Sequence, residues 1–109
     1  MIQFFLTGSR FFGTATEDSD WDYFTEDTPE ARKVLEMEGY AEVYVRIVPG
    51  NLRSVYFHSV SRKHVQLVSN VALKTRIQNA MLRNGLGPAL KHKGLARAIW
   101  KTCEELTGG

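Results

Sequence analysis

The chain has 109 residues and a mass of 12.4 kDa, the usual size of one domain, so residues 1–109 are expected to form a single domain. Its 43% hydrophobic and 24% charged residues are typical of a globular protein and exclude a low-complexity or disordered chain. No apolar run approaches the ~18–20 residues that cross a bilayer, which excludes a transmembrane helix and a membrane partner. The N-terminal residues lack the basic segment of a signal peptide, and the single cysteine has no internal disulfide partner, so we expect a cytoplasmic protein.

Charge is divided unevenly along the chain. Ten of the 12 acidic residues lie in residues 1–45, whereas eleven of the 14 basic residues lie in residues 46–109. Clustered lysine and arginine favour an anionic partner such as RNA, but the two halves of the chain can also neutralise each other across one small domain. The same two interpretations, an RNA- or triphosphate-binding surface and a solvated helix face, apply to the basic residues of the predicted C-terminal helices: Lys74, Arg76, Arg83, Lys91, Lys93, Arg97 and Lys101.

The first half of the chain predicts two strands and a helix. Residues 2–7 are short, apolar and aromatic, which favours a buried strand that ends at a Gly-Ser turn. Residues 21–25 alternate between carboxylates and apolar side chains, as a second strand would. A helix over 29–38 begins after the N-cap Thr28 and ends at Gly39.

The second half predicts a hairpin, a further strand and two helices. Residues 41–48 have strand periodicity, a turn follows at 49–51, and 53–60 forms the partner strand. After a short strand over 64–68, Asn70 caps a helix that runs to about residue 83, and Pro88 begins a last helix to about residue 106. This order predicts an α/β or α+β domain, in which a small mixed sheet has flanking helices and two helices at the C-terminal end.

Polar residues follow the first predicted strand and begin the second. Asp20 and Asp22 are separated by one residue, so on a strand they face the same way and converge on one cation, while Trp21 and Tyr23 point into the core. Mg²⁺ typically takes one or two carboxylates together with substrate phosphates. Gly8-Ser9 offers backbone that a phosphate can approach closely, and a hydroxyl donor. Carboxylate pairs also occur on solvated strand faces, so it is the Gly-Ser turn, separated from Asp20 by ten residues, that favours a nucleotide site.

Residues 6–24 resemble the nucleotidyltransferase superfamily, the DNA polymerase β-like fold that includes minimal and aminoglycoside nucleotidyltransferases. The family pattern is a Gly-Ser, a spacer of similar length, and an Asp-hydrophobic-Asp on the next strand. The matching positions are Gly8, Ser9, Gly13, Ser19, Asp20 and Asp22. The resemblance implies that Asp20 and Asp22 hold Mg²⁺ or Mn²⁺ and are catalytic. It also implies a nucleoside triphosphate at a site made by Gly8, Ser9, Arg10 and Gly13. Phage-encoded and toxin–antitoxin members of this superfamily are similarly short.

A second stretch, residues 64–73, resembles the family's third segment, and it departs from the family at one position. The family's third carboxylate is expected at position 66, where this chain has Gln66. In the family that carboxylate helps to hold the metal and accepts the proton of the attacking hydroxyl. Glutamine cannot act as a base, whereas His64, two residues away on the same predicted face, can accept a proton or can simply be an exposed strand histidine.

Two functions follow from this match and this departure. The first is an enzyme that binds magnesium–nucleoside triphosphate and transfers a nucleotidyl group to a hydroxyl of a small molecule, protein or RNA. The second is a degenerate, non-catalytic nucleotide- or RNA-binding regulatory module that has lost the third carboxylate. Because the chain is too short for a second substrate domain, a partner protein, a homo-oligomer or an RNA is expected to complete any site.

Overall fold

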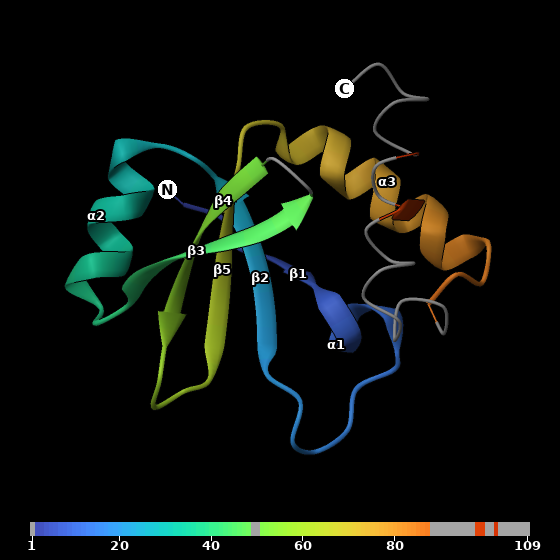
Figure 1. The fold of residues 1–109 in the computed structure, drawn as a ribbon, viewed down its shortest axis with the longest axis horizontal. Coiled ribbons are helices and arrows are strands. Elements are labelled where there is room, and N and C mark those ends of the chain that lie inside the picture. The colour runs from blue at the N-terminus through green and yellow to red at the C-terminus, as the bar shows by residue number, and fades with distance from the viewer. Residues whose placement is uncertain (1, 49–50, 88–97, 100–101, 103–109) are drawn as a thin grey trace.

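The computed structural model describes residues 2–48, 51–87, 98–99 and 102 (Figure 1). In chain order the elements are β1 (Phe5–Thr7), α1 (Gly8–Phe12), β2 (Trp21–Glu26), α2 (Pro29–Met37), β3 (Ala41–Val48), β4 (Asn51–His58), β5 (Lys63–Val68) and α3 (Val71–Arg83). The strands form a five-stranded sheet in the order β1-β2-β5-β4-β3.

The sheet is mixed, as the sequence predicted. Strand β1 pairs antiparallel with β2, β2 pairs parallel with β5, and β5, β4 and β3 follow as antiparallel neighbours. The connection between the parallel strands β2 and β5 contains α2 and the β3–β4 hairpin, which extends one side of the sheet (Figure 1). The predicted class, a mixed α/β domain with flanking helices, is confirmed.

Helices α2 and α3 pack against opposite faces of the sheet. On the α2 face, Leu35 packs with side chains of β4 and β5, namely Tyr56, Val65 and Leu67. On the α3 face, Phe12 of α1 packs with the apolar side of α3, made by Leu73, Ile77 and Met81. Strand alternation places Asp22 and His64 on the α3 face, next to the fully buried Phe24. The α1 and α3 side of the sheet therefore carries the predicted functional residues.

Local sequence signals explain where the longer helices begin. The Thr28 hydroxyl accepts the Ala31 N–H at 3.1 Å, and the Asn70 side chain accepts the Leu73 N–H at 2.9 Å. Gly39 follows α2 with a φ of +91°, which glycine adopts readily. The predicted helices at 29–38 and from Asn70 to about residue 83 are thus confirmed within a residue or two.

The remaining predicted elements are confirmed with shifted ends or lie outside the described residues. Strand β1 is shorter than the predicted 2–7, and β4 begins two residues earlier than predicted. Most of the predicted turn at 49–51 and of the last helix lies outside the described residues, although Ala98, Ile99 and Thr102 are helical. Across the described ranges, no helix combines the length and apolar character needed to cross a membrane.

Candidate functional site

Strand pairing brings the Gly-Ser turn against the second predicted carboxylate. Gly8 begins α1 directly after β1, and Thr7 pairs with Asp22 in the neighbouring strand β2. A Cβ atom on Gly8 would lie 2.5 Å from Asp22 Oδ2, and the φ of Gly8 is +70°. Both the backbone conformation and the lack of space require glycine here. The Asp22 carboxylate therefore rests directly on the backbone of the turn.

The two predicted carboxylates meet at His64. Asp22 pairs with His64 across the parallel strands β2 and β5. His64 Nδ1 lies 3.4 Å from Asp22 Oδ1 and 3.8 Å from Asp20 Oδ2, and the ring stacks on Phe57 with centroids 4.4 Å apart. Nδ1 is buried and has no hydrogen-bond partner among the residues that the structure describes. The two carboxylates thus converge on one point, as the Asp-x-Asp spacing predicted.

The partly buried position of Asp22 makes its charged form less favourable. Burial raises the pKa of Asp22 above its usual value, the nearby His64 opposes this rise, and the negative charge of Asp20 adds to it. A carboxylate held in this way is more stable when a positive charge is close to it. His64 is the group that acts in this way on Asp22.

Arg62, in the turn before β5, supplies a positive charge that sequence reasoning missed. Its Nε donates to Asp20 Oδ1 at 2.9 Å, and its Nη2 donates to the carbonyl oxygen of Asp18. Its own carbonyl oxygen accepts the Trp21 N–H at 3.1 Å. Arg62 has a φ of +56°, an uncommon conformation for a residue other than glycine. We call Asp20, Asp22, Arg62 and His64 the Asp20 cluster.

Arg10 holds the loop that precedes β2. Its Nη2 donates to the Ser19 carbonyl oxygen at 2.8 Å, and its guanidinium lies 4.2 Å from the centroid of the Trp21 ring. The prediction that Trp21 points into the core is wrong, because its residue is 39% exposed and its ring lies against Arg10 and Tyr23. Arg10 therefore lies close to the carboxylates but is engaged with the loop.

Ser9 and Gly13 have roles in the turn itself. The Ser9 carbonyl oxygen accepts the backbone N–H groups of Gly13 and Thr14, which closes α1. Gly13 has a φ of +74°, and a Cβ atom there would meet nothing within 4 Å. Gly13 is thus required by the backbone conformation, whereas Gly8 is required by the backbone and by its contact with Asp22.

Gln66 lies two residues after His64 in β5 and on the same face of the sheet. It pairs with Phe24, and its Oε1 atom is buried without a hydrogen-bond partner in the described part of the chain. The residue that the sheet register places beside Asp22 is His64, and no residue of β5 is acidic. On this face, β5 therefore carries the imidazole of His64 and the amide of Gln66.

The residues present fit a divalent cation that takes part of its ligands from a phosphate. Within the described ranges, no group of three or more histidine, cysteine, aspartate or glutamate side chains is arranged to hold a metal ion. Two converging carboxylates are nevertheless the usual protein share of a Mg²⁺–phosphate site. The absence of a side chain on Gly8 allows the Asp22 carboxylate to lie against the turn that follows β1.

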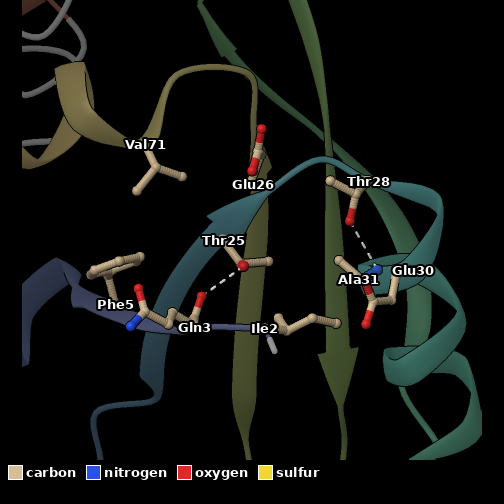
Figure 2. Close-up of a pocket in the computed structure, with 9 residues that line it drawn as sticks. All are labelled: Ile2, Gln3, Phe5, Thr25, Glu26, Thr28, Glu30, Ala31 and Val71. Carbon is tan, nitrogen blue, oxygen red and sulfur yellow. Dashed lines mark hydrogen bonds between the residues drawn. The ribbon is translucent and has the colours of Figure 1, made fainter.

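The pocket drawn in Figure 2 is separate from the Asp20 cluster. It has a volume of about 240 Å³ and lies at the other end of β2, between the first turns of α2 and α3 (Figure 2). Thr25 and Glu26 line it, and Thr25 Oγ1 donates to the Gln3 carbonyl oxygen at 2.7 Å across it. None of the predicted site residues lines this pocket.

The predicted basic surface lies largely outside the described residues, including Lys91, Lys93, Arg97 and Lys101. Of the described basic residues, Arg76 and Arg83 are exposed on α3, and Lys74 Nζ lies 5.2 Å from the centroid of the Phe24 ring. Comparison of the chain with protein-family models, with curated proteins and with solved structures finds no match in any of the three. Function is therefore inferred from the geometry of the site and from the motif in residues 6–24.

Proposed function

We propose that the chain binds a divalent metal–nucleoside triphosphate at the Asp20 cluster, in the manner of the nucleotidyltransferases that residues 6–24 resemble. The observation that carries the proposal is the contact of the Gly8 backbone with the Asp22 carboxylate, beside which Asp20 converges on the same point. The two carboxylates would hold Mg²⁺ or Mn²⁺, and the bound cation would neutralise the phosphates. Gly8 lies against Asp22, and Ser9 and Arg10 follow it in α1, so we expect a triphosphate to bind beside this turn.

Nucleotidyl transfer would extend this binding to catalysis. The hydroxyl oxygen of an acceptor forms a bond to the α-phosphorus, the bond from that phosphorus to the pyrophosphate oxygen breaks, and pyrophosphate leaves. The hydroxyl proton must pass to a base. His64 is the base candidate in the Asp20 cluster, because its unpartnered Nδ1 faces both carboxylates. The acceptor would be a hydroxyl group of a small molecule, a protein or an RNA.

A non-catalytic nucleotide-binding module is the second candidate, and a specific observation favours it. No residue of β5 supplies the third carboxylate, and Asp20 is already paired with Arg62. Such a site keeps the affinity for a metal nucleotide and lacks the anionic ligand that activates a nucleophile. This candidate shares the binding site with the first and differs from it in turnover.

Calorimetry with ATP tests the binding proposal. We expect ATP to bind in the presence of Mg²⁺ and not with EDTA, and Asp22→Asn to weaken binding about tenfold or more. Glu17→Gln is the matched control, because it removes one negative charge from the exposed loop before β2 and should leave the affinity unchanged. Equal affinity for the wild type and Asp22→Asn, with and without Mg²⁺, would contradict the proposal.

Pyrophosphate release separates the two candidates. If the chain is an enzyme, the wild type releases pyrophosphate from a triphosphate when an acceptor is supplied. His64→Ala then abolishes release and leaves ATP affinity intact. If the chain is a non-catalytic module, the wild type binds ATP and releases none with small-molecule, protein or RNA acceptors.

A further inference from the structure

Arg62 is attached to the Asp20 cluster in two different ways. Its backbone is fixed, because its carbonyl oxygen accepts the Trp21 N–H at 3.1 Å and so joins the turn before β5 to the start of β2. Its guanidinium reaches back to Asp20 Oδ1 at 2.9 Å and to the Asp18 carbonyl oxygen. The side chain can therefore leave Asp20 while the turn stays in place.

The ion pair of Arg62 with Asp20 is exposed enough to exchange. The Arg62 side chain is 52% exposed and that of Asp20 is 37% exposed. Ion pairs in such surroundings contribute little to stability, because water solvates both partners when they separate. A divalent cation has twice the charge of a guanidinium and is a strong competitor for a carboxylate pair.

We infer that Arg62 is the resident counter-cation of the Asp20–Asp22 pair and that it exchanges its carboxylate for the triphosphate when a metal nucleotide binds. This inference rests on the proposed function and assigns Arg62 a role in it. A guanidinium recognises phosphate oxygens as well as carboxylate oxygens, in both cases through paired N–H donors. The metal releases Arg62 from Asp20, and the phosphates give it a new partner close by.

This exchange couples the binding of the metal ion to the binding of the triphosphate. A free metal ion must displace Arg62 from Asp20, and only water then solvates the guanidinium. A metal–triphosphate displaces Arg62 and also binds it. Removal of the guanidinium should therefore strengthen binding of the metal alone and weaken binding of the metal nucleotide. Opposite signs are diagnostic, because a merely structural role for Arg62 would lower both affinities.

Two titrations of Arg62→Asn test the exchange. Asparagine tolerates the left-handed backbone of this position, so the turn is retained. Mn²⁺ alone, followed by electron paramagnetic resonance of the free ion, should bind about threefold to tenfold more tightly to the variant than to the wild type. Mn²⁺ with a non-hydrolysable ATP analogue, followed by calorimetry, should bind about tenfold more weakly.

Lys63→Ala is the matched control. It removes one positive charge from the next residue, which lies on the opposite face of the sheet from His64, and it should change neither affinity. If the wild type binds Mn²⁺ and the metal nucleotide, and Arg62→Asn changes both affinities in the same direction or changes neither, the exchange is refuted while the proposed function stands. If the wild type binds neither ligand, the proposed function fails, and the exchange fails with it.

Discussion

Two clusters of charged side chains occupy the sheet and its margins, and they are built differently. In one, which we call the Arg32 cluster, Arg32 lies among Asp27, Glu36, Glu42 and Tyr56. Arg32 donates from Nε and Nη2 to Asp27 at 2.9 and 3.1 Å and from Nη1 to Glu42 at 3.1 Å. The Tyr56 hydroxyl donates to Glu42 at 2.8 Å, and the Glu36 carboxylate lies 3.2 Å from it. The other is the Asp20 cluster.

The two clusters affect their carboxylates in opposite directions. In the Arg32 cluster, the hydrogen bonds from Arg32 hold the pKa of Asp27 below its usual value. Burial, the adjacent Glu42 and the adjacent Glu36 raise the pKa of Tyr56 to about 12, so its hydroxyl stays a donor. In the Asp20 cluster, burial raises the pKa of Asp22, and His64 Nδ1 is buried with no hydrogen bond to any described residue. The members of the Arg32 cluster are joined to one another by hydrogen bonds, whereas in the Asp20 cluster the hydrogen bonds of Arg62 reach Asp20 and Asp18, and His64 Nδ1 lies 3.4 Å from Asp22.

This contrast is consistent with a role in stability for the Arg32 cluster and with the function proposed for the Asp20 cluster. A polar group that is buried without a partner destabilises the folded state. Such a group beside a carboxylate pair is an arrangement suited to a ligand. The same residue types in the Arg32 cluster join α2 to the β3–β4 hairpin.

The largest expected effect is that of Gly8→Ala. The backbone at this position has a φ of +70°, which is unfavourable for alanine, and the added Cβ atom would lie 2.5 Å from Asp22 Oδ2. We therefore expect a loss of about 3 kcal/mol in the free energy of unfolding. Gly13→Ala isolates the backbone contribution, because it has a φ of +74° with nothing within 4 Å, and should cost about 1 kcal/mol. Urea denaturation measures both. Equal losses would show that Asp22 does not press on the turn.

Arg32→Met should have the next largest effect, and Arg62→Met a much smaller one. Without Arg32, Asp27 and Glu42 lose hydrogen bonds from a guanidinium, and we expect a loss of about 2 kcal/mol in the free energy of unfolding. Arg62 is more exposed than Arg32, with side-chain exposures of 52% and 33%, and its loss should cost under about 1 kcal/mol. Thermal unfolding of the two variants compares the clusters directly. A greater loss of stability in Arg62→Met than in Arg32→Met would contradict the view that the Arg32 cluster is the one that stabilises the fold.

The elements of the fold were predictable because their signals are local. Thr28-Pro29 marks the start of α2, Asn70 marks the start of α3, and the alternation over 41–48 marks β3. The convergence of Asp20 and Asp22 was also predictable, since the spacing of two residues on a strand determines it. The sequence predicted that the backbone of the Gly-Ser turn can be approached closely by a phosphate, and in the structure the group that lies against Gly8 is the Asp22 carboxylate.

The partners of the two carboxylates were not predictable, because they come from tertiary pairing. The register of β2 against β5 decides that His64 and not Gln66 lies beside Asp22, and no local pattern determines a register between strands so far apart in the chain. Arg62 reaches Asp20 across 42 positions from a turn whose sequence is not distinctive. Trp21 lies at the start of β2, and part of its ring remains exposed beside Arg10.

The smallest effect, and the one with a sign that distinguishes the clusters, is the pH dependence of Asp22→Asn and Asp27→Asn. The folded state raises the pKa of Asp22, so the charged form opposes folding above that pKa, and the opposition disappears as the pH falls below the usual carboxyl value. Asp22→Asn should therefore stabilise the protein at pH 7, by under about 1 kcal/mol, and should lose this advantage towards pH ~3.

The folded state lowers the pKa of Asp27, so its charged form contributes stability above the usual carboxyl value, and that stability is lost as the pH falls through the lowered pKa. Asp27→Asn should therefore destabilise the protein at pH 7, again by under about 1 kcal/mol, and approach the wild type in acid. Denaturation of the three proteins between pH 3 and pH 7 would contradict the contrast if both variants shifted stability in the same direction.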